Sequence, residues 1–225
     1  MYIITIDGPS SSGKSTVAGL VAEKLGIAHI NSGEAYRAIA YFMLNQGIMP
    51  TDSTNIENAL NNNTFKMEYS QGKQRLYANG VDITKHLHTN QINAVVSQYG
   101  RNAAVIYKSS DMAREVSNDI SVVMEGRNLG SFCFPDAKYK FYVDCDVKER
   151  AKRRYKEMIE KGVDVEFETI YNQTVERDNL DKTRAVAPLV VPKNSVMIDS
   201  TYLTPDQVAE KIVKIVLDNE NINRM

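Results

Sequence analysis

The sequence predicts an α/β fold in which a central parallel sheet of about five strands is covered by helices on both faces. The first observation is a set of short apolar runs of strand length, which lie at 2–6, 27–30, 120–124, 138–143 and 195–199. Continuous apolar runs of this kind are typical of strands that are buried on both faces. The second observation is that stretches with helical spacing of apolar residues separate these runs, which favours parallel strands joined by helices.

The third observation is the segment that joins the first strand to the first helix. Gly8 to Ser15 fits the pattern G-x-x-x-x-G-K-[ST] between a predicted strand and a predicted helix, as a phosphate-binding P-loop requires. The turning backbone N–H groups of such a loop point at phosphate oxygens. Lys14 is expected to bind the transferred phosphoryl group, and the Ser15 hydroxyl is expected to ligate Mg²⁺. The predicted ATP-binding residues are Gly8, Pro9, Ser10, Ser11, Ser12, Gly13, Lys14, Ser15 and Thr16.

The first half of the chain changes character once. Helices are predicted over 14–25, ended by Gly26, and over 34–46, ended by Gly47, and a weak helical patch follows at 56–60. The segment 65–84 instead alternates apolar and polar residues, with turns at Gln71-Gly72 and Asn79-Gly80. This pattern predicts a small antiparallel β element. Helical patterns resume over 89–118.

The second half contains three further predicted helices. Asp146 and Glu149 form a plausible N-cap and capping partner for a helix that runs to about 161, where Gly162 ends it. The next helix is predicted over 167–178. Thr204, Pro205 and Gln207 then have the pattern of a helix start.

Composition excludes several classes of function. The net charge of −1 gives no general attraction to nucleic acid or to an anionic membrane. No apolar run approaches the roughly 20 residues that span a bilayer, and no leader pattern is evident, so we expect a cytoplasmic protein. Cys133 and Cys145 form no C-x-x-C pair, and we expect buried reduced thiols rather than a disulfide.

Arginines follow the predicted strand ends that should surround one crevice. In parallel sheets, ligands bind at the carboxyl ends of the strands, which here carry the P-loop, 32–37, 125–130 and the segment after 143. A guanidinium can pair two phosphate oxygens at once, which suits an acceptor clamp. Arg153 and Arg154 point in different directions, and an ion-paired solvated face would also explain part of their helix. The arginines concerned are Arg37, Arg127, Arg150, Arg153, Arg154, Arg177 and Arg184.

Several segments together match one known family. They are 8–16, Ser32-Gly33 with Tyr36-Arg37, Gly126-Arg127 with Gly130, 134–137, 149–154, Arg177-Asp178 with Asp181, and 184–189. Across nearly its whole length the chain resembles the bacterial cytidylate kinases, a branch of the nucleoside monophosphate kinases. The resemblance implies a monomer with one P-loop kinase domain, made of a core (about 1–32, 119–145 and 190–225), a monophosphate-binding insert (33–118) and a helical lid (146–189).

The resemblance also implies an activity and its residues. The reaction is direct in-line transfer of phosphate from ATP to CMP or dCMP, with Mg²⁺. Ser97 would lie near the base, and Asp181 would contact the acceptor sugar. The implied catalytic residues are Lys14, Arg153, Arg154, Arg177 and Arg184. The implied acceptor-binding residues are Ser32, Tyr36, Arg37, Ser97, Arg127, Asn128, Asp181 and Arg184.

Five positions depart from the family pattern, namely Asn31, Ala35, Ile106, Glu125 and Asn128. The family has Asp at the first and the last two of these positions, Met at the second, and an Arg that helps to read cytosine at the third. Arg101 or Lys108 could substitute for that arginine. The alternative is therefore a kinase of the same fold for a different monophosphate or a non-nucleotide small molecule. A nucleotide-dependent switch is a second alternative, although a switch needs no arginine clamp for an acceptor.

Overall fold

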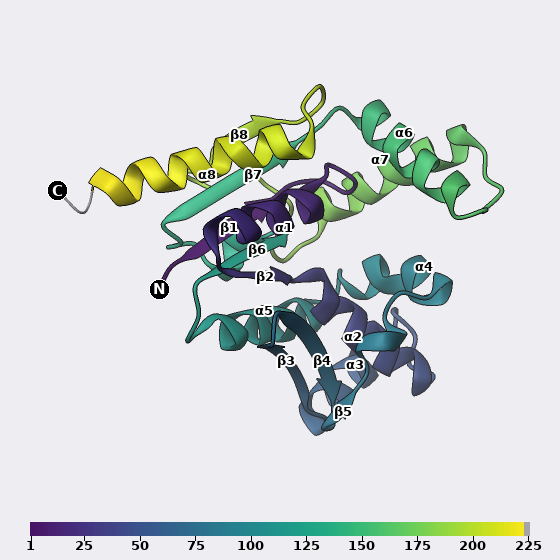
Figure 1. Cartoon of the computed structure of the whole chain (residues 1–225). Coiled ribbons are helices and arrows are strands. Elements are labelled where there is room, and N and C mark those ends of the chain that lie inside the picture. The colour runs from purple at the N-terminus through teal and green to yellow at the C-terminus, as the bar shows by residue number, and fades with distance from the viewer. Residues whose placement is uncertain (223–225) are drawn as a thin grey trace.

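Five parallel strands form the central sheet of the computed structural model, which describes residues 1–222 (Figure 1). The strand order is β2-β6-β1-β7-β8, and every neighbouring pair is parallel. The predicted parallel sheet is therefore confirmed. Its strands are β1 (Ile3–Asp7), β2 (Ala28–Asn31), β6 (Val122–Gly126), β7 (Tyr139–Asp144) and β8 (Val196–Asp199).

Two hydrophobic clusters cover the two faces of this sheet. Successive strand side chains point to opposite faces, so Val123 of β6 packs in one cluster and Val122 and Met124 pack in the other. The first cluster joins the sheet to α1 (Lys14–Leu25) and α8 (Pro205–Ile222). The second joins it to α2 (Gly33–Asn45) and α5 (Ala103–Ser117).

A small antiparallel sheet, β3-β4-β5, lies in the insert at the bottom of Figure 1. Gln71, Gly72, Asn79 and Gly80 all have positive φ, as expected for tight hairpin turns, and the predicted β element is confirmed. The Gln74 side chain ties this sheet to the core, because its amide pairs with the N–H and the C=O of Asn31, each at 2.9 Å. The insert also contains α3 (Ser53–Asn62), β3 (Phe65–Ser70), β4 (Lys73–Ala78), β5 (Val81–Asp82) and α4 (Asn90–Tyr99).

Two helices beyond β7, α6 (Val147–Glu160) and α7 (Phe167–Thr183), pack against each other. Of the predicted capping pair at the start of α6, the N-cap is confirmed and the capping partner is wrong. Asp146 accepts from the N–H groups of Lys148 and Glu149, but its own N–H donates to Thr201 on a neighbouring loop instead of to Glu149. At the start of α8, in contrast, Thr204 and Gln207 bond each other reciprocally as predicted.

Four further sequence predictions can be compared with the fold. The helix α7 runs on to Thr183, whereas its predicted end was at 178, and α3 is longer than the predicted patch at 56–60. Both cysteines are buried and free, as expected. Among residues 1–222, no helix has the length and apolar character needed to cross a membrane.

Candidate active site

The loop between β1 and α1 turns where only glycine is easily accommodated. Gly8 has a φ of 151°, and a Cβ at this position would collide with the carbonyl oxygen of Val143 on β7. Gly13, at the other end of the loop, has a φ of 90°. Because Gly13 directly precedes α1, the loop delivers the chain to the amino-terminal end of that helix, where free N–H groups favour an anion.

The Lys14 side chain curls back over this loop. It is only 4% exposed, and its Nζ donates to the Pro9 carbonyl at 2.5 Å and to Ser12 Oγ at 3.4 Å. Burial lowers the pKa of Lys14 well below its usual value, and the nearby Arg127 lowers it further. A bound anion would favour the charged ammonium, so the site is electrostatically suited to phosphate.

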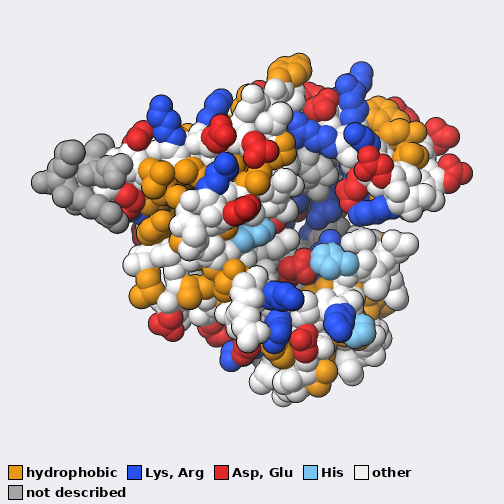
Figure 2. Space-filling model, viewed as in Figure 1, with side chains coloured by type: hydrophobic (Ala, Val, Ile, Leu, Met, Phe, Trp, Pro, Cys, Tyr) orange, Lys and Arg blue, Asp and Glu red, His pale blue; other side chains and the backbone are white. Residues whose placement is uncertain are grey.

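A cavity of about 800 Å³ extends from this loop to residues of α2, α4, β6 and α7. Figure 2 shows the hollow, with Lys and Arg side chains on its walls. Of the expected ATP-binding residues, Gly8, Pro9 and Ser12 do not line the cavity. The sequence-predicted residues that line the cavity are Ser10, Ser11, Gly13, Lys14, Ser15, Thr16, Ser32, Tyr36, Arg37, Ser97, Arg127, Asn128, Arg153, Arg154, Arg177, Asp181 and Arg184.

Two arginines on the cavity wall, the buried Arg184 and the half-buried Arg177, each have one buried N–H group without a partner among residues 1–222. Arg184 donates through Nε to the Ala187 carbonyl at 2.6 Å, yet its Nη2 has no hydrogen-bond partner among the described residues. Arg177 Nε likewise has no hydrogen-bond partner among residues 1–222. Burial, reinforced by the charge of Arg127, lowers the pKa of Arg177 to about 10. Buried polar groups are normally paired, so these guanidinium groups are poised to receive an anion.

The other two acceptor-side arginines have protein partners. Arg127 pairs through Nε with Asp181 Oδ2 at 3.0 Å, so two residues expected to contact the same acceptor contact each other. Arg37 donates through Nη1 to the Leu87 carbonyl at 3.1 Å and to Asn93 Oδ1 at 2.7 Å. These contacts hold both guanidinium groups at the cavity wall.

Arg153 and Arg154 leave α6 in different directions, as helical geometry requires. Arg153 Nη2 donates to the Ser200 carbonyl at 2.8 Å, on the loop after β8. Arg154 Nη1 instead pairs with Glu157 at 2.8 Å on its own helix. Both side chains line the cavity, Arg153 beside the P-loop and Arg154 toward α7.

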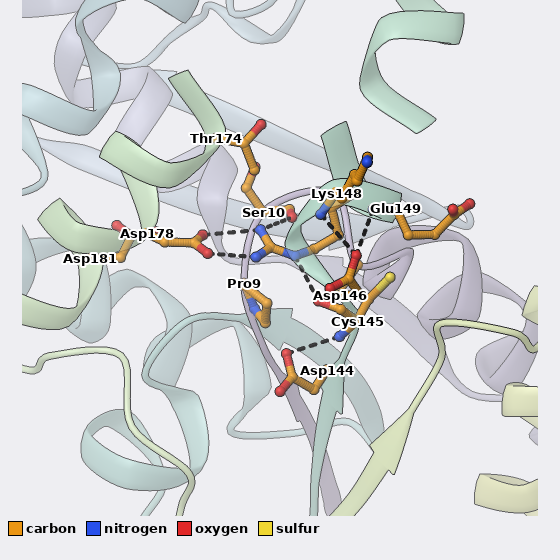
Figure 3. Close-up of polar contacts among 12 residues, drawn as sticks. Pro9, Ser10, Asp144, Cys145, Asp146, Lys148, Glu149, Thr174, Asp178 and Asp181 are labelled. Atoms are coloured by element: carbon orange, nitrogen blue, oxygen red, sulfur yellow. Dashed lines mark hydrogen bonds and ion pairs between the residues drawn. The ribbon is translucent and has the colours of Figure 1, made fainter. Parts of the chain in front are cut away.

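Arg150 does not line the cavity, and its guanidinium bonds neighbouring protein groups instead. Its guanidinium is the unlabelled group at the centre of Figure 3, where the dashed lines from Ser10 and Asp178 meet. Nε donates to the Cys145 carbonyl at 2.9 Å, Nη1 donates to the Ser10 carbonyl at 3.1 Å, and both Nη atoms pair with Asp178, at 3.1 and 2.5 Å. The residue is 3% exposed. Arg150 therefore anchors the P-loop, the end of β7 and α7 to one another.

Two acidic residues at strand ends, Asp7 and Glu125, are not among the predicted site residues, although Glu125 was placed at the crevice and named as a departure from the family pattern. Asp7 is fully buried at the end of β1 and accepts from the N–H groups of Leu129 and Gly130, at 2.8 and 2.7 Å, which shapes a π-helical turn over Leu129–Cys133. Glu125, at the end of β6, lines the cavity and is 4% exposed. Its Oε1 lacks a hydrogen-bond partner within residues 1–222. The available signal was a carboxylate directly after a buried apolar run.

The departures from the family pattern have different structural settings. Asn31 Oδ1 accepts from the Gly33 N–H at 2.9 Å, a contact that a carboxylate oxygen could make equally well. Ala35 and Ile106 are both fully buried, and neither belongs to the residues that line the cavity. Arg101 lines a second, adjoining cavity of about 1300 Å³. Asn128 lies on the wall of the first cavity, and its Nδ2 is without a partner in the described part of the chain.

Comparisons with known proteins agree with this geometry. A sequence profile of the family described as cytidylate kinase matches residues 4–218. The chain is 37% identical to the cytidylate kinase of Thermosipho africanus, over 96% of this chain and 94% of that protein. It is 36% identical to the cytidylate kinase of Bacillus subtilis, with 95% of each chain covered.

One solved structure shares the fold at much lower sequence identity. A solved structure of an uncharacterised protein from Eubacterium ventriosum superposes with a TM-score of 0.51 at 14% identity, over 96% of this chain and 98% of that one. That likeness concerns the fold alone. The profile match and the relatives, in contrast, cover nearly the whole length of the sequence. The chain belongs to the cytidylate kinase family.

Proposed function

We propose that the protein transfers the γ-phosphoryl group of ATP to CMP or dCMP, which gives the nucleoside diphosphate and ADP. The names of its relatives support the acceptor. The observation that carries the chemistry is that Lys14 of the P-loop shares one cavity with Arg177 and Arg184, whose buried donors include atoms unpartnered within residues 1–222. A nucleotide switch needs no such second anion site, and a different acceptor class is not favoured by the family match.

On the donor side, the P-loop would hold the ATP phosphates and Lys14 would contact the transferred group. Mg²⁺ is the cation that the family implies, and oxygen ligands suit it. The Ser15 hydroxyl and the Glu125 carboxylate both line the cavity, and Glu125 Oε1 lacks a partner in the part of the chain that is described. These two residues fit Mg²⁺ and would hold it, and the ion would supply charge neutralisation for the phosphates.

On the acceptor side, Arg37 and Arg127 would bind the monophosphate. Asp181, which is paired with Arg127, would contact the sugar, and Ser97 with Asn128 would lie near the base. Arg153, Arg154, Arg177 and Arg184 come from the lid and would surround the reacting phosphates. Ser32 and Tyr36 complete this wall, although the Ser32 hydroxyl already donates to the Glu125 carbonyl at 2.7 Å.

The mechanism is positioning combined with electrostatic stabilisation. A monophosphate is largely dianionic near pH 7, because its second pKa is about 6, so the acceptor needs no strong general base. Lys14 and the arginines hold the two phosphates in line and spread the charge that develops during transfer. Closure of the lid over the cavity excludes water, which would otherwise hydrolyse ATP. We further propose that one monomer, with core, insert and lid in a single domain, performs the whole reaction.

An acceptor screen tests this function. The purified protein is incubated with ATP, Mg²⁺ and one of CMP, dCMP, UMP, AMP or GMP, and ADP release is followed by a coupled assay. We expect turnover with CMP and dCMP. Failure of all five acceptors would overturn the proposal and favour a non-nucleotide acceptor.

The matched control is Lys14→Ala, because it also reveals any contaminating kinase. Removal of this ammonium should abolish transfer, with a loss of at least about 10²-fold, since its contact with the phosphoryl group is made in the transition state. Circular dichroism should show an unchanged fold, because the lost hydrogen bonds join only neighbouring loop residues. Retained turnover in Lys14→Ala would contradict the assignment of this residue.

A further inference from the structure

A buried side-chain nitrogen of His29, a residue with no role assigned above, faces a buried carboxylate oxygen of Glu125 across neighbouring strands. His29 lies on β2 and Glu125 on β6, and the register pairs His29 with Val123 and Asn31 with Glu125. Because residues two apart on a strand share a face, the His29 and Glu125 side chains lie diagonally on the same side of the sheet. The distance from His29 Nε2 to Glu125 Oε1 is 4.0 Å.

Neither atom of this pair has a hydrogen-bond partner among residues 1–222, and both are buried. Such atoms are rare in folded proteins, and each instance needs an explanation. The two are chemically complementary, since an imidazole N–H is a donor and a carboxylate oxygen is an acceptor. A separation of 4.0 Å is about 1 Å too long for a hydrogen bond, a gap that a small side-chain rotation would close.

The surroundings of Glu125 indicate from which side His29 approaches the carboxylate. The carboxylate lines the cavity beside Lys14 and Ser15, whereas His29 is not one of the residues lining it. The imidazole therefore approaches from behind the cavity wall. A hydrogen bond from that side would fix one carboxylate oxygen and leave the other facing the cavity.

We propose that His29 is a positioning residue, which donates its Nε2–H to Glu125 Oε1 and orients the second carboxylate oxygen toward the metal of the ATP site. The inference rests on the proposed function. Carboxylates that bind metals are themselves held by hydrogen bonds, and loss of such a support typically weakens metal affinity by about 10- to 100-fold. His29 would thus tune the affinity for the divalent cation without touching either substrate.

The test measures metal binding directly. Mn²⁺ is titrated into the protein with a non-hydrolysable ATP analogue, and the bound fraction is followed by electron paramagnetic resonance. The variants His29→Phe and His29→Leu remove the donor while filling the space, and His29→Gln keeps an N–H donor. We expect the first two to weaken Mn²⁺ binding by about 10-fold and the third to retain most of the affinity. The Mg²⁺ concentration for half-maximal turnover should rise in parallel, with kcat restored at saturating Mg²⁺.

A double-variant cycle separates positioning from a general structural effect. In a Glu125→Ala background, His29→Phe should cause no further loss of Mn²⁺ affinity, because the partner is gone. Unchanged Mn²⁺ affinity in both donor-free variants, or an equal loss in both backgrounds, would overturn the inference. If the acceptor screen fails but Mn²⁺ binding still depends on His29 through Glu125, the proposed acceptor is wrong and the positioning role stands.

Discussion

At the scale of single residues, Arg177 is expected to lower the stability of the fold. It lies half-buried on the cavity wall, its pKa is lowered to about 10 by desolvation, and its buried Nε lacks a partner in the described chain. A buried charge without full pairing destabilises a fold. Residues of this kind persist where function needs them, so stability and activity should respond to Arg177 in opposite directions.

The variant Arg177→Met tests this opposition. Replacement of the guanidinium by an apolar side chain of similar length should raise the free energy of unfolding by about 1 kcal/mol, because a desolvated and incompletely paired charge is removed. Loss of a donor to the transferring phosphoryl group should lower kcat by about 10²- to 10³-fold. Urea denaturation and the coupled ADP assay measure the two effects.

A matched control is Arg75→Met on β4, a half-buried arginine that lies outside the cavity lining. Both its stability and its turnover should stay close to those of the unmodified protein. A less stable Arg177→Met with unchanged kcat would show that the guanidinium supports the fold instead of the reaction.

The sequence predicted some residue positions better than others for a physical reason. The P-loop residues follow from local spacing, because the turn and the helix start lie within one short segment. Whether an arginine faces phosphate or protein depends on distant elements, so Arg150 could not be separated from Arg153 by sequence alone. The contact between His29 and Glu125 could not be predicted, because it exists only once β2 and β6 pair.

At the scale of elements, one ion pair joins α6 to α7, and its arginine also bonds the P-loop and the end of β7. Arg150 of α6 pairs with Asp178 of α7, and the same guanidinium bonds the Ser10 and Cys145 carbonyls. The side chains of the pair are 4% and 9% exposed, so the contact is buried. The position of α7, which carries Arg177 and Asp181, therefore depends on this pair.

Asp178→Leu should be among the most destabilising single changes in the lid. It leaves the Arg150 charge buried without its partner, which typically costs about 3–5 kcal/mol. The double variant Arg150→Met with Asp178→Leu should recover much of that loss, since both charges are then gone. The free energy of unfolding from urea titration decides the outcome.

Glu157→Gln provides the control for this prediction on the same helix. Glu157 pairs with Arg154 and Lys161 at the surface, and exposed pairs contribute roughly 1 kcal/mol or less. A loss at Asp178 no larger than the loss at Glu157 would mean that the buried pair is not an anchor.

Element types were predicted more reliably than element ends. The continuation of α7 past 178 follows from contacts that the sequence does not reveal, such as the bond from the Leu189 N–H to the Asp181 carbonyl at 2.8 Å. The π-helical turn after β6 depends on Asp7, which lies far away in the chain. Both features are set by tertiary contacts and not by local propensity.

At the scale of the whole molecule, the site is shared between parts that face each other. The second cavity, of about 1300 Å³, lies between α4 of the insert and α7 of the lid and adjoins the first through Ser97, Arg177 and Arg184. Kinases of small molecules commonly close such clefts around both substrates. We expect the insert and the lid to approach each other when both nucleotides are bound.

Small-angle X-ray scattering tests this expectation. The radius of gyration should fall when CMP and a non-hydrolysable ATP analogue are both added, and it should fall less with either nucleotide alone. The reason is that the lid arginines gain their anionic partners only when both phosphates are present. GMP with the same analogue is the control. An unchanged radius with both nucleotides would mean that catalysis proceeds without closure.

The ion pair between Arg127 and Asp181 has a consequence for selectivity. Because Asp181 already pairs with Arg127 Nε, an incoming acceptor must compete with this carboxylate for the guanidinium. A dianionic phosphate can replace the carboxylate as counter-ion and free Asp181 to accept from hydroxyl groups. An uncharged nucleoside brings no counter-ion, so we expect cytidine not to bind at the acceptor site, whatever contacts its base could make there.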